Sequence, residues 1–138
     1  MAVDKYLNTL SLARKAGLAE LGEEPVGAAA RARKAYVIVV ASDAGDHTWR
    51  RAKSFAAGTD QQCVRLDATK EALGAAIGRQ SLAIAAVTDP GMALALVQGL
   101  PAPDPAVVAV LEDKDRRARQ RRQEAKAHQR NLRKGKKK

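Results

Sequence analysis

The sequence predicts an α/β fold, with helices on both faces of one sheet and a basic helical tail at the C-terminus. Helix-like and strand-like patterns alternate five times over about the first 100 residues, which is typical of this class. Residues 36–40 read YVIVV, and such an apolar run between polar residues predicts a strand buried on both faces. Residues 112–138 hold 13 of the 25 Lys and Arg but only 4 of the 15 Asp and Glu. The tail therefore carries +9 of the formal net charge of +10.

The first half of the chain predicts two helices and two strands. Asp4 can cap a first helix, and Gly17 lies just past its end. Residues 18–21 form a short strand, and a helix over 24–33 follows. The residues GEEP at 22–25 suit a helix entry, because proline is tolerated in a first turn and acidic side chains complement the helix dipole there. The strand over 36–41 comes next.

The second half repeats the alternation. Its predicted elements are a helix over 47–57 stopped by Gly58, a strand over 63–66, a helix capped by Asp67 or Thr69 and ending at Gly78, a strand over 81–87, and a helix capped by Asp89 with Pro90 in its first turn. Each helix except the first thus follows a strand, as the sandwich requires.

The proline-rich stretch PAPDP at 101–105 divides the chain. We predict a globular domain over residues 1–103 and a basic tail, helical or disordered, over 104–138. Ala, Arg, Gln and Glu in the tail are good helix formers. Because the sequence after Leu111 has no sustained apolar stripe, we expect it not to pack on the domain.

Composition limits the chemistry that we expect. The one cysteine, Cys63, rules out an internal disulfide framework and fits a buried strand residue in a reducing compartment. No apolar run approaches the roughly 20 residues of a membrane span. The sequence lacks a phosphate-binding loop and a nucleophile elbow, and His47 and His128 have no neighbour at metal-ligand spacing. We therefore expect a cytoplasmic monomer without enzymatic activity, cofactor, metal or membrane contact.

The charge of the tail predicts a polyanionic partner, and nucleic acid is the commonest one for a soluble protein. The tail arginines are expected to contact phosphate groups. They are Arg116, Arg117, Arg119, Arg121 and Arg122.

Five short motifs occur in an order that resembles a known family. They are LARKAG at 12–17, GEE at 22–24, ASDA at 41–44, LG with IG between 73 and 78, and VTDPG at 87–91. In this order they resemble the kink-turn RNA-binding ribosomal protein family (the L-seven-Ae and L-thirty-e group), most of all its bacterial YlxQ-like branch. The resemblance covers roughly residues 4–100 and leaves the tail outside.

The resemblance implies a three-layer α/β/α sandwich around a four-stranded mixed sheet, with an RNA surface formed by two loops. One loop is the turn into the second helix, and the other joins the fourth helix to the fourth strand. With an arginine in the second helix added, the expected RNA contacts are Gly22, Glu23, Glu24, Arg31, Gly78, Arg79 and Gln80.

Three positions depart from the family's pattern. The Asn, Glu and Lys that contact the kink-turn in the family correspond here to Glu24, Pro25 and Ala28. Ala28 has no charge to pair with phosphate, and the Glu24 carboxylate accepts hydrogen bonds but does not donate them.

Three functions are compatible with these observations. The leading hypothesis is a non-enzymatic RNA-binding protein that binds rRNA, a kink-turn or another structured RNA, on the ribosome or elsewhere. The alternative is a protein–protein interaction module of the same fold, which has lost specific RNA recognition and keeps a non-specific polycationic tail. The weakest is the substrate-binding domain of an RNA-modifying enzyme, because we expect no room for a cofactor domain.

Overall fold

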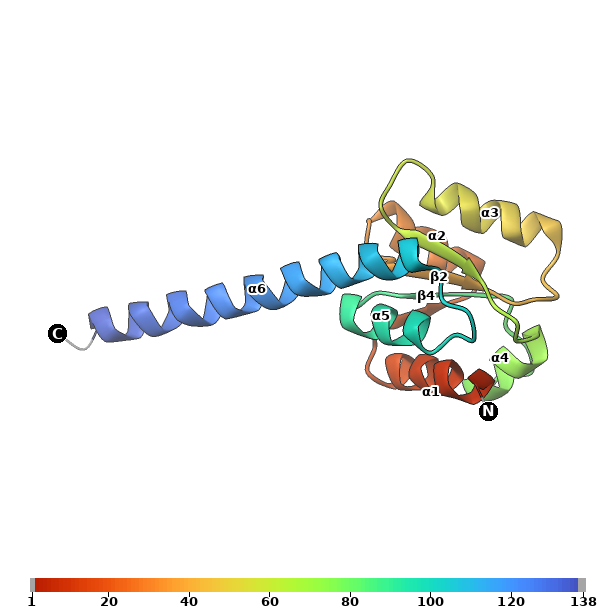
Figure 1. Ribbon diagram of the computed structural model, residues 1–138, viewed down its shortest axis with the longest axis horizontal. Helices are drawn as coiled ribbons and strands as arrows, with labels where there is room; N and C mark the ends of the chain where they lie inside the picture. Colours follow the sequence, from red (N-terminus) through yellow and green to blue (C-terminus); the bar gives the residue numbers. More distant parts are fainter. Residues whose placement is uncertain (1, 137–138) are drawn as a thin grey trace.

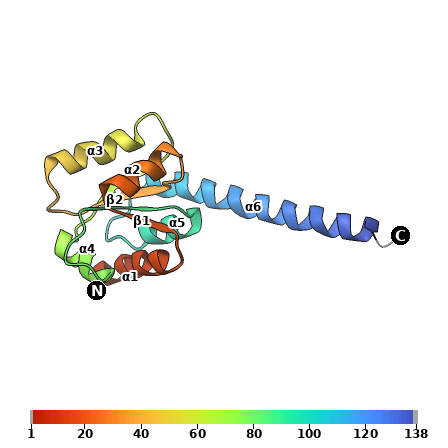
Figure 2. The ribbon, with the colours of Figure 1, turned by 180° about the vertical axis from the view of Figure 1, so that it is seen from behind.

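A four-stranded sheet forms the middle layer of the molecule, which a computed structural model describes over residues 2–136 (Figures 1 and 2). The strands are β1 (Ala19–Leu21), β2 (Val37–Val40), β3 (Gln62–Arg65) and β4 (Ile84–Val87), in the spatial order β1-β4-β2-β3. Helices α2 (Glu23–Arg31) and α3 (Asp46–Ala56) cover one face, and α1 (Ala2–Lys15), α4 (Lys70–Ala76) and α5 (Pro90–Gln98) cover the other. The predicted α/β/α sandwich with a mixed sheet is confirmed.

Strand β2 is the centre of the core. All four of its residues are buried, as the run of apolar residues predicts. It pairs in parallel with β3 and antiparallel with β4, so that Val40 lies opposite both Ile84 and Arg65. Ala85 and Ala86 of β4 are fully buried, and their small side chains let the helices pack close to the sheet.

The pairing gives the sheet two distinct ends. At one end, β1, β2 and β3 finish and β4 begins, and we call this the loop end. At the other end, β1, β2 and β3 begin and β4 finishes, and we call this the arm end. Helix α6 (Pro105–Lys136) leaves the domain at the arm end and extends far beyond it (Figure 1).

Local backbone conformation shifts several predicted boundaries. Helix α2 ends at Arg31, before the predicted 33, because Arg33 adopts a left-handed φ of 57°. Strand β4 begins at Ile84 because the Leu82 N–H donates to the Lys70 carbonyl, away from the sheet. The cap of α1 is also wrong, since that helix begins at Ala2 and contains residue 4. The caps of the later helices are found at Thr69 and Asp89, whose side chains accept from backbone N–H groups of α4 and α5.

The first four turns of α6 dock on α5, contrary to the expectation that the segment after Leu111 does not pack. Val107, Leu111 and Asp115 are spaced four residues apart on one side of the helix, and 9%, 1% and 6% of their surfaces are exposed. The Asp115 carboxylate lies against the first turn of α5, where the helix dipole favours a negative charge. Gly91 makes room for it, since a Cβ there would lie 3.2 Å from Asp115 Oδ1. Arg119 Nη2 completes the contact at 3.0 Å from Asp115 Oδ2.

Helix α1 is attached to the loop before α4 through Tyr6. The fully buried Tyr6 hydroxyl donates to Asp67 Oδ1 and accepts from the Ala68 N–H at 3.1 Å. Burial of the ring, with the hydrogen bond to Asp67, raises the pKa of Tyr6 well above its ordinary value.

The docking of α6 predicts unequal effects for its two leucines. Leu111 is 1% exposed and Leu132 is 53% exposed. We expect Leu111→Ala to lower the free energy of unfolding by about 2–4 kcal/mol, because it leaves a cavity between α6 and the domain. Leu132→Ala should change it by less than about 0.5 kcal/mol. Urea denaturation measures both, and equal small effects would show that α6 does not dock in solution.

The Tyr6 hydroxyl predicts a pH-dependent stability. Tyr6→Phe leaves Asp67 and the Ala68 N–H without this partner, so we expect a loss of about 1–3 kcal/mol at neutral pH. The raised pKa of Tyr6 in the folded state means that its contribution is complete below about pH 10 and declines above it. The difference in unfolding free energy between the wild type and Tyr6→Phe should therefore shrink as pH rises from 9 toward 12. A constant difference over that range would contradict the assignment.

Candidate nucleic-acid interface

The two predicted RNA loops lie at the same end of the sheet, the loop end. The Gly22 N–H donates to the Ile84 carbonyl at 3.0 Å, and Ile84 begins the strand that the second loop enters. Because β1 and β4 are antiparallel, the residue after β1 and the residues before β4 reach the same end. The structure thus places six of the seven predicted domain contacts at the same end of the sheet: Gly22, Glu23, Glu24, Gly78, Arg79 and Gln80.

Gly22 begins α2 in a backbone conformation that favours glycine. Its φ is 95°, and no side chain caps the helix at this position. An alanine there would meet only Pro25 Cδ at 3.8 Å, so the constraint comes from the backbone conformation itself. The turn exposes the start of α2 without covering it with a capping side chain.

The second loop is held by Gly74 in α4. The Arg79 N–H donates to the Gly74 carbonyl at 2.8 Å, and the loop crosses directly over the glycine. A Cβ on Gly74 would lie 2.6 Å from both the N and the Cα of Ser81. The loop begins at Gly78, whose φ is 77°, and the side chains of Arg79 and Gln80 that follow are exposed.

The acidic residues of the first loop have different environments. Glu23 Oε1 lies 2.6 Å from Arg51 Nε, and the Arg51 guanidinium lies over the Phe55 ring at 5.3 Å from its centroid. This group joins the start of α2 to α3. Glu24 is exposed and takes part in no ion pair with the described side chains of residues 5–133. Its carboxylate is therefore the more accessible hydrogen-bond acceptor of the two.

Arg31 does not join the two loops. It is the last residue of α2, eight residues beyond Glu23, which corresponds to about 12 Å along the helix axis. Its guanidinium lies near the middle of the helix, since a Cβ on Gly27 would be 3.3 Å from Arg31 Nη1. A contact of Arg31 with the same RNA segment as the loops would need a ligand that extends along α2.

Two of the positions that depart from the family's pattern lie together over the edge strand. Pro25 and Ala28 line an open hollow of about 440 Å³, beside Glu20 of β1 and Lys34 after α2. Its two charged groups have opposite signs. This surface therefore does not present a concentration of positive charge.

The tail arginines fall into two groups. Asp113 pairs with Arg116 at 2.6 Å and with Arg117 at 3.0 Å, and Asp115 pairs with Arg119. Arg121 and Arg122 are exposed and take part in no ion pair within the described chain.

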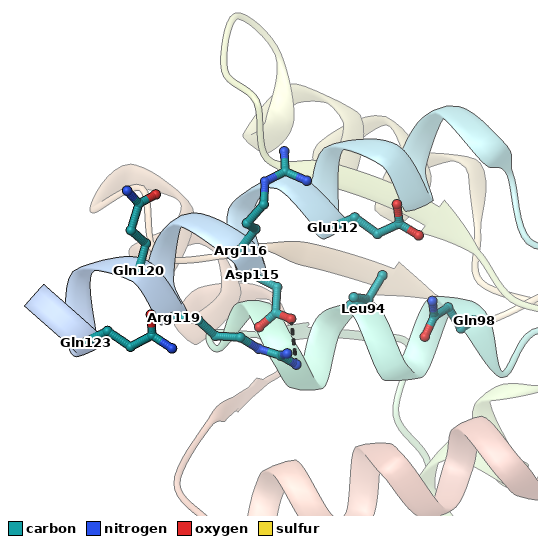
Figure 3. Close-up of a pocket in the computed structure, with 8 residues that line it drawn as sticks. All are labelled: Leu94, Gln98, Glu112, Asp115, Arg116, Arg119, Gln120 and Gln123. Carbon is teal, nitrogen blue, oxygen red and sulfur yellow. Dashed lines mark ion pairs between the residues drawn. The ribbon is translucent and has the colours of Figure 1, made fainter.

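A groove of about 480 Å³ follows the line between α5 and α6 (Figure 3). Its lining mixes amide, carboxylate and guanidinium groups around one half-buried leucine, and the Asp115–Arg119 pair spans it. The lining residues are Leu94, Gln98, Glu112, Asp115, Arg116, Arg119, Gln120 and Gln123. The polar lining suits a hydrated, charged ligand better than an apolar one.

The remaining observations concern the cysteine thiol, possible metal ligands and the hydropathy of the helices. Burial raises the pKa of the half-buried Cys63 thiol to about 11, so it is protonated at neutral pH. Among residues 5–133, whose side chains the structure describes, no group of three or more His, Cys, Asp or Glu is placed to hold a metal ion. In the same range, no helix has the length and apolar character needed to cross a membrane.

Sequence reasoning missed a second group of basic residues, at the arm end. Arg14 and Lys15 lie in the last turn of α1, and Arg33 and Lys34 follow α2. Bases near helix C-termini are a signal visible in the sequence, because they complement the dipole. Their common location depends on the sheet topology, which the sequence pattern did not give.

Comparisons with known proteins found solved structures with a similar fold. The solved structures that are similar to this chain include the following two. A protein of unknown function from Bacillus halodurans is 24% identical with a TM-score of 0.60, and the match covers 78% of this chain and 97% of that one. The Giardia lamblia 15.5kD RNA binding protein is 15% identical with a TM-score of 0.56, and the match covers 81% and 82% of the two chains. Searches with models of protein families and among curated proteins found no match.

The close contact of Gly74 predicts a specific requirement for glycine. Gly74→Ala should lower the free energy of unfolding by about 1–3 kcal/mol, because its methyl group overlaps the backbone of Ser81. Gly45→Ala is the matched control, since nothing lies within 4 Å of its Cβ and its φ of −66° suits alanine. Thermal and urea unfolding of the two variants measure the difference. Equal stabilities would mean that the loop does not cross Gly74 as described.

Proposed function

We propose that this protein is a non-enzymatic RNA-binding protein that recognises structured RNA, such as rRNA or a kink-turn. The observation that carries the proposal is the distribution of charge, since residues 112–138 hold +9 of the net +10. Most of these residues belong to α6, which projects from a nearly neutral domain (Figure 1). The fold shared with the Giardia 15.5kD RNA binding protein supports the same function.

The domain offers the groups that read RNA in loops and bulges, where bases are splayed out. Arg79 and Gln80 are exposed beside the Gly22 turn, and their side chains donate hydrogen bonds to phosphates or base edges. The exposed Glu24 carboxylate accepts from exocyclic amino groups, as carboxylates do from cytosine. The loops would supply selectivity and α6 would supply affinity through release of counterions from the phosphates.

One observation favours the second candidate, a protein–protein interaction module with a non-specific tail. Helices α2, α3 and α4 each begin at the loop end with an acidic residue in the first turn, namely Glu23, Asp46 and Glu71. Such a surface repels phosphate and suits a basic protein surface. The two candidates therefore differ in whether the loop end contacts RNA.

Binding of the full chain to two RNAs separates these candidates. We expect a kink-turn RNA to bind more tightly than an unstructured RNA of equal length, and Arg79→Gln to reduce this preference about tenfold, or about 1.4 kcal/mol. Arg50→Gln, at an exposed arginine of α3, should weaken both RNAs equally. Fluorescence anisotropy at several salt concentrations measures the constants. If the full chain shows no preference and Arg79→Gln behaves like Arg50→Gln, the loops do not recognise RNA and the second candidate is favoured.

A further inference from the structure

Positive charge gathers at the arm end of the sheet, opposite the two loops. Helices α1 and α2 finish there, with Arg14 and Lys15 in the last turn of one and Arg33 and Lys34 just after the other. All four side chains are exposed. The acidic Asp60 at this end is neutralised, because Lys114 of α6 pairs with it and lowers its pKa.

Helix α6 continues this positive surface beyond the domain. We call residues 119–136 the arm, because α6 leaves α5 after the Asp115 contact (Figures 1 and 2). Five basic residues of the arm follow one another at spacings of three or four, which places them on one side of the helix. This basic stripe consists of Arg119, Arg122, Lys126, Arg130 and Arg133. Its ends are 14 positions apart in the sequence, which corresponds to about 21 Å of helix axis.

The stripe carries more unpaired positive charge than the opposite side of α6. Arg117 and Arg121 lie there, since Arg121 is nine residues from Arg130 and about half a turn away around the helix. Arg117 is already paired with Asp113. Four stripe residues, Arg122 through Arg133, are exposed, and they take part in no ion pair in the part of the chain with described side chains, residues 5–133. The free positive charge of the described arm is therefore mostly one-sided.

The stripe faces the same side as the end of α1. Asp115 and Arg119 lie on the side of α6 that meets the first turn of α5, and the stripe continues from Arg119. Helix α1 packs along α5, and the Thr88 N–H at the start of α5 donates to the Leu18 carbonyl just after α1, at 2.8 Å. The last turn of α1 thus lies at the same end of the sheet as the root of the arm, with the start of α5 between them (Figures 1 and 2). Arm and domain form a corner whose two walls carry positive charge.

The composition of the arm indicates which form of RNA fits this corner. Proteins that hold single-stranded RNA stack its bases on aromatic side chains, and residues 119–136 contain no Phe, Tyr or Trp. Duplex RNA presents phosphates on a convex surface, and proteins recognise it through shape and backbone contacts. A straight basic stripe beside a second basic surface matches such a duplex.

We infer that the arm and the end of α1 form a second RNA-binding surface, distinct from the loops, that holds the phosphate backbone of a double-stranded RNA segment. Its residues are those of the basic stripe together with Arg14 and Lys15. The inference depends on the proposed function only in taking RNA as the partner. It divides four of the five arginines predicted from the tail sequence, because Arg119 and Arg122 lie on the binding side and Arg117 and Arg121 do not.

Paired double variants of the full chain test the surface. The probe is an RNA hairpin with a 16-base-pair stem, compared with oligouridine of equal length. Lys126→Gln/Arg130→Gln removes two stripe charges, and Arg117→Gln/Arg121→Gln removes two charges from the opposite side. Glutamine preserves helix propensity, which circular dichroism checks. Arg14→Gln/Lys15→Gln tests the second wall.

The stripe variant should reduce the slope of log K against log salt by about 1.4–1.8 and weaken stem binding about 30-fold near 0.1 M salt. The opposite-side variant should reduce the slope by less than a third of that amount. Arg14→Gln/Lys15→Gln should reduce the slope by about as much as the stripe variant does. Equal losses of affinity for the stripe variant and the opposite-side variant, or equal affinities for the stem and oligouridine, would overturn the inferred duplex-binding surface. Either result would leave RNA binding itself in place. Absence of binding to either RNA at 50 mM salt would overturn the proposed function itself.

Discussion

The burial of strand β2 on both faces is the constraint on which the other features depend. Four consecutive apolar residues, Val37–Val40, can be removed from water only if helices cover both sides of the sheet. Pairing β2 in parallel with β3 and antiparallel with β4 then decides which connections share an end. That arrangement places the Gly22 turn and the 78–81 loop at the same end of the sheet and separates both from the arm. The position of each candidate surface is thus a consequence of core packing.

The direction of the helices adds a separation of charge. Helices α1, α2 and α3 all finish at the arm end, and each carries a basic residue in its last turn. Acids in first turns and bases in last turns stabilise each helix locally through its dipole. Because the helices run in the same direction, these local preferences add up across the molecule. The loop end becomes acidic and the arm end basic without any helix departing from ordinary dipole complementarity.

The sequence predicted the features that depend on neighbouring residues. The strand at 36–41 and the caps at Thr69 and Asp89 could be recognised because their signals lie within a few residues of each other. Arg31 was grouped with the loops although it lies at the far end of α2, because position along a helix matters only once the helix is placed. Asp115 was missed as a docking residue for a similar reason. A carboxylate in a charged run appears solvent-exposed until Gly91, 24 residues earlier, is brought against it.

The Asp115 contact fixes the distance over which the arm can contact a ligand. Docking through Leu111 and Asp115 supplies the ordered turns on which the remaining helix propagates, so the arm does not have to nucleate alone. Arg133 then stands 18 residues beyond Asp115, or about 27 Å along a fixed direction. A ligand that contacts both Lys15 and Arg133 must itself extend over a distance of that order. Short or tightly folded molecules are thereby excluded by length alone, whatever their charge.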